Sequence, residues 1–105
     1  VPPYGLLAKT AAYSGLRAGE LAALRIGDVM LMRPGYEHIR VQRTVARENG
    51  QWVFSQPKSA NSVRDVPLPG FLVEELRAYI AAHPRRAEPS APLWPARRRG
   101  GYGDN

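Results

Sequence analysis

The sequence predicts a small α+β domain with two N-terminal helices, a three-stranded antiparallel meander, one following helix and an irregular C-terminal tail. Apolar residues recur with helical spacing in residues 3–13, 17–25 and 70–82. Between the last two of these segments, residues 38–68 have the period of strands separated by turns. Residues 84–105 are rich in Pro, Arg and Gly, a composition that disfavours regular structure. A chain of 105 residues has room for one domain and not for two.

The three expected helices have recognisable start and stop signals. The first, residues 3–13, has a proline near its start, and Gly15 is placed to cap its end. The second, residues 17–25, restarts directly after this Ser-Gly corner and has leucines three residues apart. The third, residues 70–82, has an apolar face and ends before Pro84. Each helix therefore has an apolar face to pack against a core.

The strands are predicted from alternation and from turn dipeptides. Residues 37–47 alternate between apolar and polar side chains, as a half-buried strand does. Asn49-Gly50 follows, the pair favoured in type I′ hairpin turns. The return strand is expected at residues 52–54, a second turn at 56–61 and a third strand at 62–68. We therefore expect a meander in which each strand pairs with the next.

Charge narrows the class of partner. Fifteen basic residues face nine acidic ones, which gives a net charge of +6 and a pI near 10.3. Thirteen of the fifteen are arginine, whose guanidinium suits bidentate contact with phosphate. Nucleic acid is therefore the expected partner class. The alternative is an arginine-biased genome, in which arginine replaces lysine on solvated faces.

Composition also excludes several kinds of site. Cysteine is absent, which excludes disulfides and thiolate metal sites, and two histidines are too few to predict a zinc or iron centre. We expect no cofactor. No apolar run approaches the ~20 residues needed to cross a bilayer, so no membrane partner is expected. The start has neither an initiator methionine nor a signal-peptide pattern and looks like a cut inside a longer protein.

Arg17 and Lys58 are the two residues that attract a chemical interpretation. A cation at a helix N-terminus is unfavourable by about 0.3–1 kcal/mol, so Arg17 is expected to meet an anion such as a phosphate or Glu20. Lys58 is one of two lysines in the chain and is expected at a hairpin tip, where it can swing and donate a proton. The alternatives are a solvated first-turn arginine and an ordinary exposed turn lysine.

Two segments carry a resemblance to a known family. SGLRAGELAALRIGDV (14–29) and PKSANSVRDVPLP (57–69) resemble the first half of the catalytic domain of tyrosine recombinases, the phage integrase family. Members of that family carry a (T/S)GLRxxELxxLxxxD motif and then a lysine on the turn between the second and third strands. The resemblance covers roughly residues 5–82. Type IB topoisomerases share the catalytic plan and remain an alternative.

The resemblance implies roles for five residues. Arg17 would be the first catalytic arginine, which clamps the scissile phosphate. Lys58 would be the general acid toward the leaving 5′ oxygen. Glu20 matches the acidic position that supports the active site, and a carboxylate there would lower the cost of burying Arg17. Asp28 ends the motif and is interpreted as structural. Arg64 matches a common basic position, either as a DNA backbone contact or as a surface residue. Arg17 and Lys58 are expected to lie close together on a basic face.

The family's remaining catalytic residues are not found in this chain. A His-x-Leu-Arg-His type box and the tyrosine nucleophile are expected downstream. His83-Pro84-Arg85-Arg86 has part of the spacing but falls too early, and Tyr102 lies in a Gly-rich tail. Residues 1–105 are therefore expected to be part of a catalytic domain that binds DNA without cutting it. The alternatives are a non-catalytic basic DNA-binding module and an inert remnant. The full-length protein is expected to self-associate on DNA. It is expected to be cytoplasmic and of bacterial or phage origin.

Overall fold

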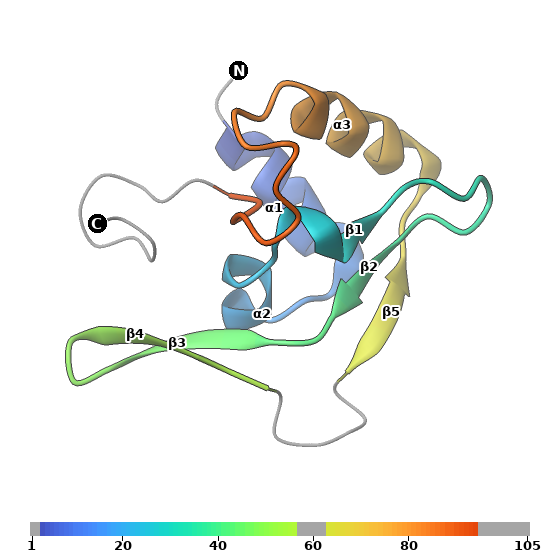
Figure 1. Ribbon diagram of the computed structural model, residues 1–105. Coiled ribbons are helices and arrows are strands. Elements are labelled where there is room, and N and C mark those ends of the chain that lie inside the picture. Colours follow the sequence, from blue (N-terminus) through green and yellow to red (C-terminus); the bar gives the residue numbers. More distant parts are fainter. Residues whose placement is uncertain (1–2, 57–62, 95–105) are drawn as a thin grey trace.

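The computed structural model describes residues 3–56 and 63–94 and confirms the α+β class (Figure 1). Three α-helices and one short 3-10 helix are present in this part of the chain: α1 (Pro3–Ser14), α2 (Ala18–Ala22), η1 (Ile26–Asp28) and α3 (Gly70–Ala81). The strands are β1 (Val29–Met30), β2 (His38–Val41), β3 (Thr44–Glu48), β4 (Gln51–Ser55) and β5 (Arg64–Pro67). None of the described helices is both long and apolar enough to cross a membrane.

The corner between α1 and α2 forms as its sequence predicts. Gly15 has a φ of +71°, a left-handed conformation that favours glycine, and its N–H donates to the Ala11 carbonyl at 3.3 Å. Leu16 then enters the core with 8% of its surface exposed. This buried leucine fixes where α2 begins, one residue after Arg17.

α2 is shorter than the expected helix over residues 17–25, because residues 24–26 bond to the segment 91–93. Arg25 has extended backbone and forms a β-bridge with Pro92. The Leu24 carbonyl accepts the Leu93 N–H at 2.9 Å, and the Ile26 N–H donates to the Ala91 carbonyl, also at 2.9 Å. These tertiary hydrogen bonds take the place of a further helical turn.

The strand pairing differs from the expected meander, although the strands themselves lie close to their predicted places. β1, β2 and β5 form one antiparallel sheet with β2 in the centre, and β3 pairs with β4 in a separate hairpin. The expected strand over residues 37–47 is divided at Gln42-Arg43. Both of these side chains bind the Asp28 carboxylate, so the chain leaves the sheet there. The two-residue strand β1 was not predicted.

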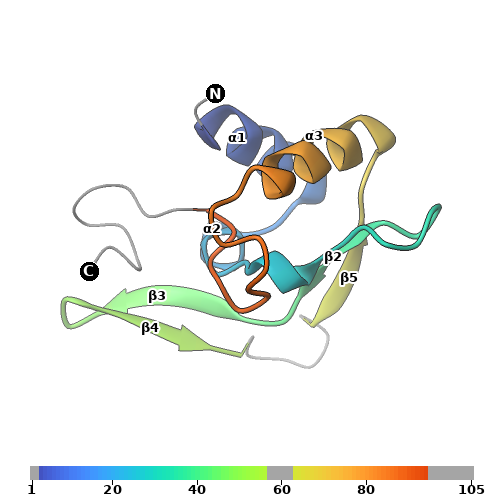
Figure 2. The ribbon, with the colours of Figure 1, turned by 45° about the horizontal axis from the view of Figure 1, so that its top comes forward.

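The β3–β4 hairpin confirms the predicted Asn-Gly turn. Asn49 and Gly50 have φ of +51° and +79°, the positive values that a type I′ turn requires at both central positions. The hairpin extends away from the three-stranded sheet and passes beneath α2 (Figure 2). The hairpin therefore provides a packing surface for α2 that the β1–β2–β5 sheet does not provide.

The core lies between the helices and the two sheets. α1 and α3 pack side by side (Figures 1 and 2), and Lys9 on α1 bonds Glu75 on α3 at 3.0 Å. Most of the buried apolar side chains form one cluster, which α1 and β5 cover with partly buried residues. The cluster consists of Leu16, Leu21, Leu24, Ile26, Val29, Ile39, Val41, Leu72, Leu76, Ala91, Leu93 and Trp94.

The irregular segment after α3 is anchored at Leu93 and Trp94, which are 0% and 3% exposed. His83 is also buried, and its Nε2 lies 3.1 Å from the Pro92 carbonyl. Its Nδ1 accepts the Arg85 N–H at 3.0 Å. Both ring nitrogens of His83 therefore lie within hydrogen-bonding distance of backbone groups of this segment.

Gly19 is the point at which α2 and β3 come closest. A Cβ added there would lie 2.5 Å from the Thr44 Oγ1 and 2.7 Å from the Val45 carbonyl oxygen. We expect Gly19→Ala to lower the free energy of unfolding by about 1–3 kcal/mol, the usual cost of overpacking. Urea unfolding measures this. Gly5→Ala, in α1 with nothing within 4 Å of the added carbon, is the control and should be neutral or stabilising. An unchanged midpoint for Gly19→Ala would contradict the close approach.

Candidate nucleic-acid interface

Arg17 occupies the N-cap of α2 with extended backbone, and its side chain is exposed. Its backbone N–H donates to the Glu20 Oε1 at 3.0 Å. Within residues 3–56 and 63–94, no hydrogen bond or ion pair of its guanidinium is found. Arg17 therefore has a fixed backbone position and a cationic group available to an anion.

Glu20 lies one helical turn further and is 3% exposed. Arg64, at the first residue of β5, binds both of its oxygens: Nη1 to Oε2 and Nη2 to Oε1, each at 3.1 Å. These hydrogen bonds from Arg64, and then that from the Arg17 N–H, lower the pKa of the Glu20 carboxyl against the opposing effect of burial. Glu20 is therefore an ionised, fully engaged carboxylate at the start of α2.

The charge of Glu20 is matched by Arg64 and not by Arg17. The expectation that this carboxylate would lower the cost of burying Arg17 is therefore wrong, because the Arg17 side chain is exposed. Glu20 accepts a hydrogen bond from the Arg17 backbone N–H, and the Arg17 guanidinium contributes only a smaller Coulombic attraction that also lowers the pKa of Glu20. An arginine fork on one buried carboxylate is also the most geometrically specific of the protein ion pairs.

Arg64 is placed by the pairing of β5 with β2. Its Cα partner is Val41, whose side chain is buried, whereas the next pair, Arg40 and Asp65, points to the opposite face. The hydrogen bonds to Glu20 raise the pKa of the Arg64 guanidinium above its ordinary value. Arg64 therefore faces α2 across the sheet edge, and its expected DNA contact stays a prediction.

Asp28 repeats the arrangement of Glu20 eight residues later. It is 3% exposed, and it accepts the Arg25 N–H at 3.0 Å, the Gln42 Nε2–H at 2.8 Å and a guanidinium N–H of Arg43. This fits the structural role expected for Asp28. Sequence reasoning missed Gln42 and Arg43. The repeated Arg-x-Gly-acid spacing of RAGE and RIGD signals only that Asp28, like Glu20, accepts the N–H of the arginine three residues earlier.

Lys58 lies outside the described residues, as does Tyr102. The expected closeness of Lys58 to Arg17 therefore stays a prediction. Among the residues that the structure describes, no group of three or more His, Cys, Asp or Glu side chains is arranged to hold a metal ion.

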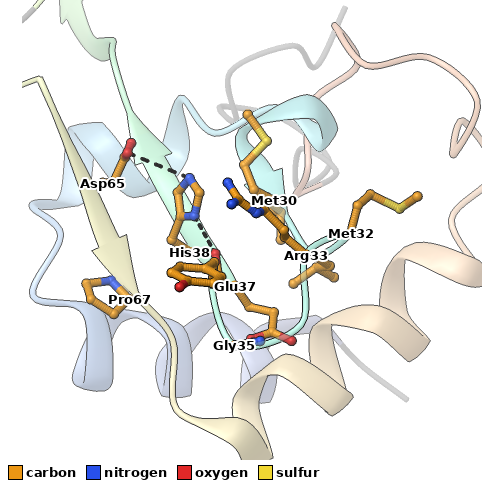
Figure 3. A pocket seen from close by; sticks show the side chains of 11 residues that line it. Met30, Met32, Arg33, Gly35, Glu37, His38, Asp65 and Pro67 are labelled. Atoms are coloured by element: carbon orange, nitrogen blue, oxygen red, sulfur yellow. Dashed lines mark hydrogen bonds and ion pairs between the residues drawn. The ribbon is translucent and has the colours of Figure 1, made fainter.

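A pocket of about 720 Å³ lies elsewhere, beside the loop between β1 and β2 (Figure 3). On its wall the His38 Nε2 lies 3.8 Å from a carboxylate oxygen of Asp65, and the Arg33 guanidinium lies 4.8 Å from the centre of the Tyr36 ring. Neither Arg17 nor Glu20 lines this pocket. The candidate interface is therefore an exposed helix end and not a cavity.

No family model matches the chain. It is 33% identical over 81 residues to proteins named as the prophage phiRv2 integrase in two strains of Mycobacterium tuberculosis. The match covers 77% of this chain and 21% of each relative. The chain thus spans about a fifth of the length of the curated relatives it matches.

Solved structures of the Tn1549 transposon integrase share the fold. One, in complex with transposon right end DNA, has a TM-score of 0.67 at 21% identity and covers 95% of this chain and 32% of that chain. Another, with a circular intermediate DNA, has a TM-score of 0.66 at 19% identity and covers 93% of this chain and 31% of that chain. At these identities the likeness concerns the fold.

The lowered pKa of Glu20 predicts a stability difference that depends on pH. We expect Glu20→Gln to lower the free energy of unfolding by about 1.5–3 kcal/mol at pH 7, the usual contribution of a hydrogen bond to a charged group. Because the folded-state pKa lies below the ordinary 4.5, this contribution is complete above pH 4.5 and is lost as pH falls through the folded pKa. Denaturant unfolding of both proteins across this range measures the difference.

Glu75→Gln is the matched control, because its ion pair with Lys9 is exposed. It should cost less than about 1 kcal/mol. A Glu20→Gln penalty that keeps its full size in acid, down to the lowest pH at which both proteins fold, would contradict an ionised Glu20.

Proposed function

We infer that this chain, a fragment of the tyrosine recombinase (phage integrase) family, supplies part of the catalytic domain of a site-specific DNA recombinase. The family assignment combines the two sequence motifs with the similarity to a prophage integrase and the shared fold of a transposon integrase. In the whole protein, residues 1–105 would be one portion of the domain that breaks and rejoins DNA strands.

The observation that carries the proposal is that the exposed guanidinium of Arg17, at a rigid helix start, has no hydrogen bond or ion pair with any residue in 3–56 or 63–94. Its backbone is held between the buried Leu16 and the buried Glu20. A guanidinium there can bind two oxygens of one phosphate through parallel N–H donors. A cation placed there by a fixed backbone stabilises the negative charge that grows on a phosphate in the transition state.

Lys58 is proposed as the general acid on the evidence of its motif. In the family's reaction, a tyrosine oxygen attacks phosphorus and forms a 3′-phosphotyrosyl bond while the bond to the 5′ oxygen breaks. A lysine ammonium would donate its proton to that leaving oxygen. Glu20 would support this site by fixing Arg17, and the tyrosine would come from another part of the full-length protein.

Double-stranded DNA is the proposed partner, and the full-length protein is proposed to self-associate on it in the bacterial cytoplasm. The Tn1549 integrases that share this fold were solved with DNA. The net charge of +6 supports the same partner, because phosphate contacts supply most non-specific affinity.

A sequence-reading DNA-binding module is less well supported. α2 has five residues, and two of them, Glu20 and Leu21, are buried. A recognition helix needs several exposed side chains that reach base edges in the major groove. The resemblance to integrase motifs also favours a recombinase over a type IB topoisomerase.

We expect the chain to bind duplex DNA weakly and with little sequence preference, with Kd of about 10⁻⁴ to 10⁻⁶ M at physiological salt. Arg17→Ala should weaken binding about three- to eightfold at 0.1 M salt and reduce the salt slope by about 1, since one phosphate contact is lost. Fluorescence anisotropy with a short duplex across a salt series measures both quantities.

Arg40→Ala removes the same charge from the opposite face of the sheet and is the control. Its effect should be smaller than twofold, as roughly expected for a charge that meets no phosphate. Equal losses for Arg17→Ala and Arg40→Ala would show that only total charge matters.

The chain should not nick supercoiled DNA, because no tyrosine nucleophile is expected within it. Electrophoresis under denaturing conditions, with a search for protein joined to a 3′ phosphate, tests this. A covalent adduct that Tyr102→Phe abolishes would overturn the proposal that the nucleophile lies in another part of the protein.

A further inference from the structure

Two arginines compete for one buried carboxylate at the start of α2. Glu20 is 3% exposed, and its Oε1 already accepts the Arg17 backbone N–H at 3.0 Å. A buried carboxylate requires a cationic partner, because burying an unpaired charge is costly. Arg17 is only three residues away in sequence, yet Arg64, 44 residues away, provides that partner.

We propose that Arg64 is a positioning residue that keeps the Arg17 guanidinium available to phosphate by occupying the Glu20 carboxylate. The proposal rests on the proposed function of Arg17 as a phosphate contact. Arg64 takes one hydrogen bond on each oxygen of Glu20, at 3.1 Å each. With the Arg17 N–H as a third donor, both carboxylate oxygens are hydrogen-bonded and the charge is already paired with one guanidinium.

Removal of Arg64 would change the partner of Glu20. The carboxylate would retain only the backbone N–H of Arg17 among these three hydrogen bonds. The Arg17 side chain is exposed, long and flexible, and the negative charge of Glu20 lies one helical turn away. The Arg17 guanidinium would then turn onto Glu20 and would be withdrawn from solvent and from DNA.

Arg64 suits this role because its backbone is rigid. It is the first residue of β5, paired with Val41 of the central strand β2. Its charge is neutralised by Glu20, so the pair has no net charge and Arg17 contributes the net positive charge at this helix end. The alternative role of Arg64, a direct contact to the DNA backbone, would use N–H donors other than the two that bind Glu20.

The test measures how much Arg17→Ala weakens duplex DNA binding in three backgrounds: wild type, Arg64→Met, and Arg64→Met with Glu20→Gln. In wild type the loss should be about three- to eightfold at 0.1 M salt. In Arg64→Met it should be less than about twofold, because Arg17 is already engaged by Glu20. With Glu20→Gln added, the loss should return to its wild-type size, because an uncharged amide does not capture Arg17.

A general charge effect is separated from positioning by this design and by one control. Arg40→Met removes the same charge from the other face of the sheet and should leave the Arg17→Ala loss unchanged. Circular dichroism verifies the fold of each variant. If Arg64→Met does not fold, Arg64→Lys is compared with the double variant. Both should keep the full Arg17→Ala loss. In Arg64→Lys a cation still pairs with Glu20, and in the double variant position 20 carries no charge.

The outcomes separate the two proposals. Equal Arg17→Ala losses in wild type and in a folded Arg64→Met protein would overturn the positioning role and leave the phosphate contact intact. If Arg64→Met does not fold, a lost Arg17 effect in the folded Arg64→Lys or double variant would overturn it. Absence of any Arg17→Ala loss in wild type would instead overturn the proposed function of Arg17.

Discussion

The ion pair between Glu20 and Arg64 is the interaction on which the rest of the site depends. α2 has only five residues, far fewer than an isolated helix needs to be stable in water. Glu20 accepts a backbone N–H from its first turn and binds β5 through Arg64. The close approach of Gly19 to β3 fixes the other side of the helix. Tertiary contacts therefore set the position of α2, and with it the position of Arg17.

A second buried carboxylate shapes the sheet in the same way. Asp28 accepts the N–H of Arg25 and binds Gln42 and Arg43, the two residues between β2 and β3. Buried ion pairs are weak evidence for stability, because desolvation offsets much of their attraction. Their effect here is geometric. One fixes the helix start, and the other directs the β3–β4 hairpin beneath α2.

Local sequence patterns predicted the elements that depend on local chemistry. The Gly15 corner, the Asn49-Gly50 turn and the helix over Gly70–Ala81 appear close to where glycine, turn and apolar spacing place them. The division of the long strand and the pairing of β5 with β2 were not predicted. Both depend on side chains that bond over long separations, 15 residues for Arg43 with Asp28 and 44 for Arg64 with Glu20. Alternation of apolar residues has the same period whichever strand is the partner, so it does not identify the pairing.

Within the described residues 3–56 and 63–94, the Arg17 guanidinium is available to phosphate whereas that of Arg64 binds Glu20. Side-chain Nε–Hε NMR of the unmodified chain, titrated with a short DNA duplex, tests this claim most directly. We expect a saturable shift of the Arg17 resonance and an Arg64 resonance that stays in its ion-paired position. A shift of the Arg64 resonance with no change at Arg17 would contradict it.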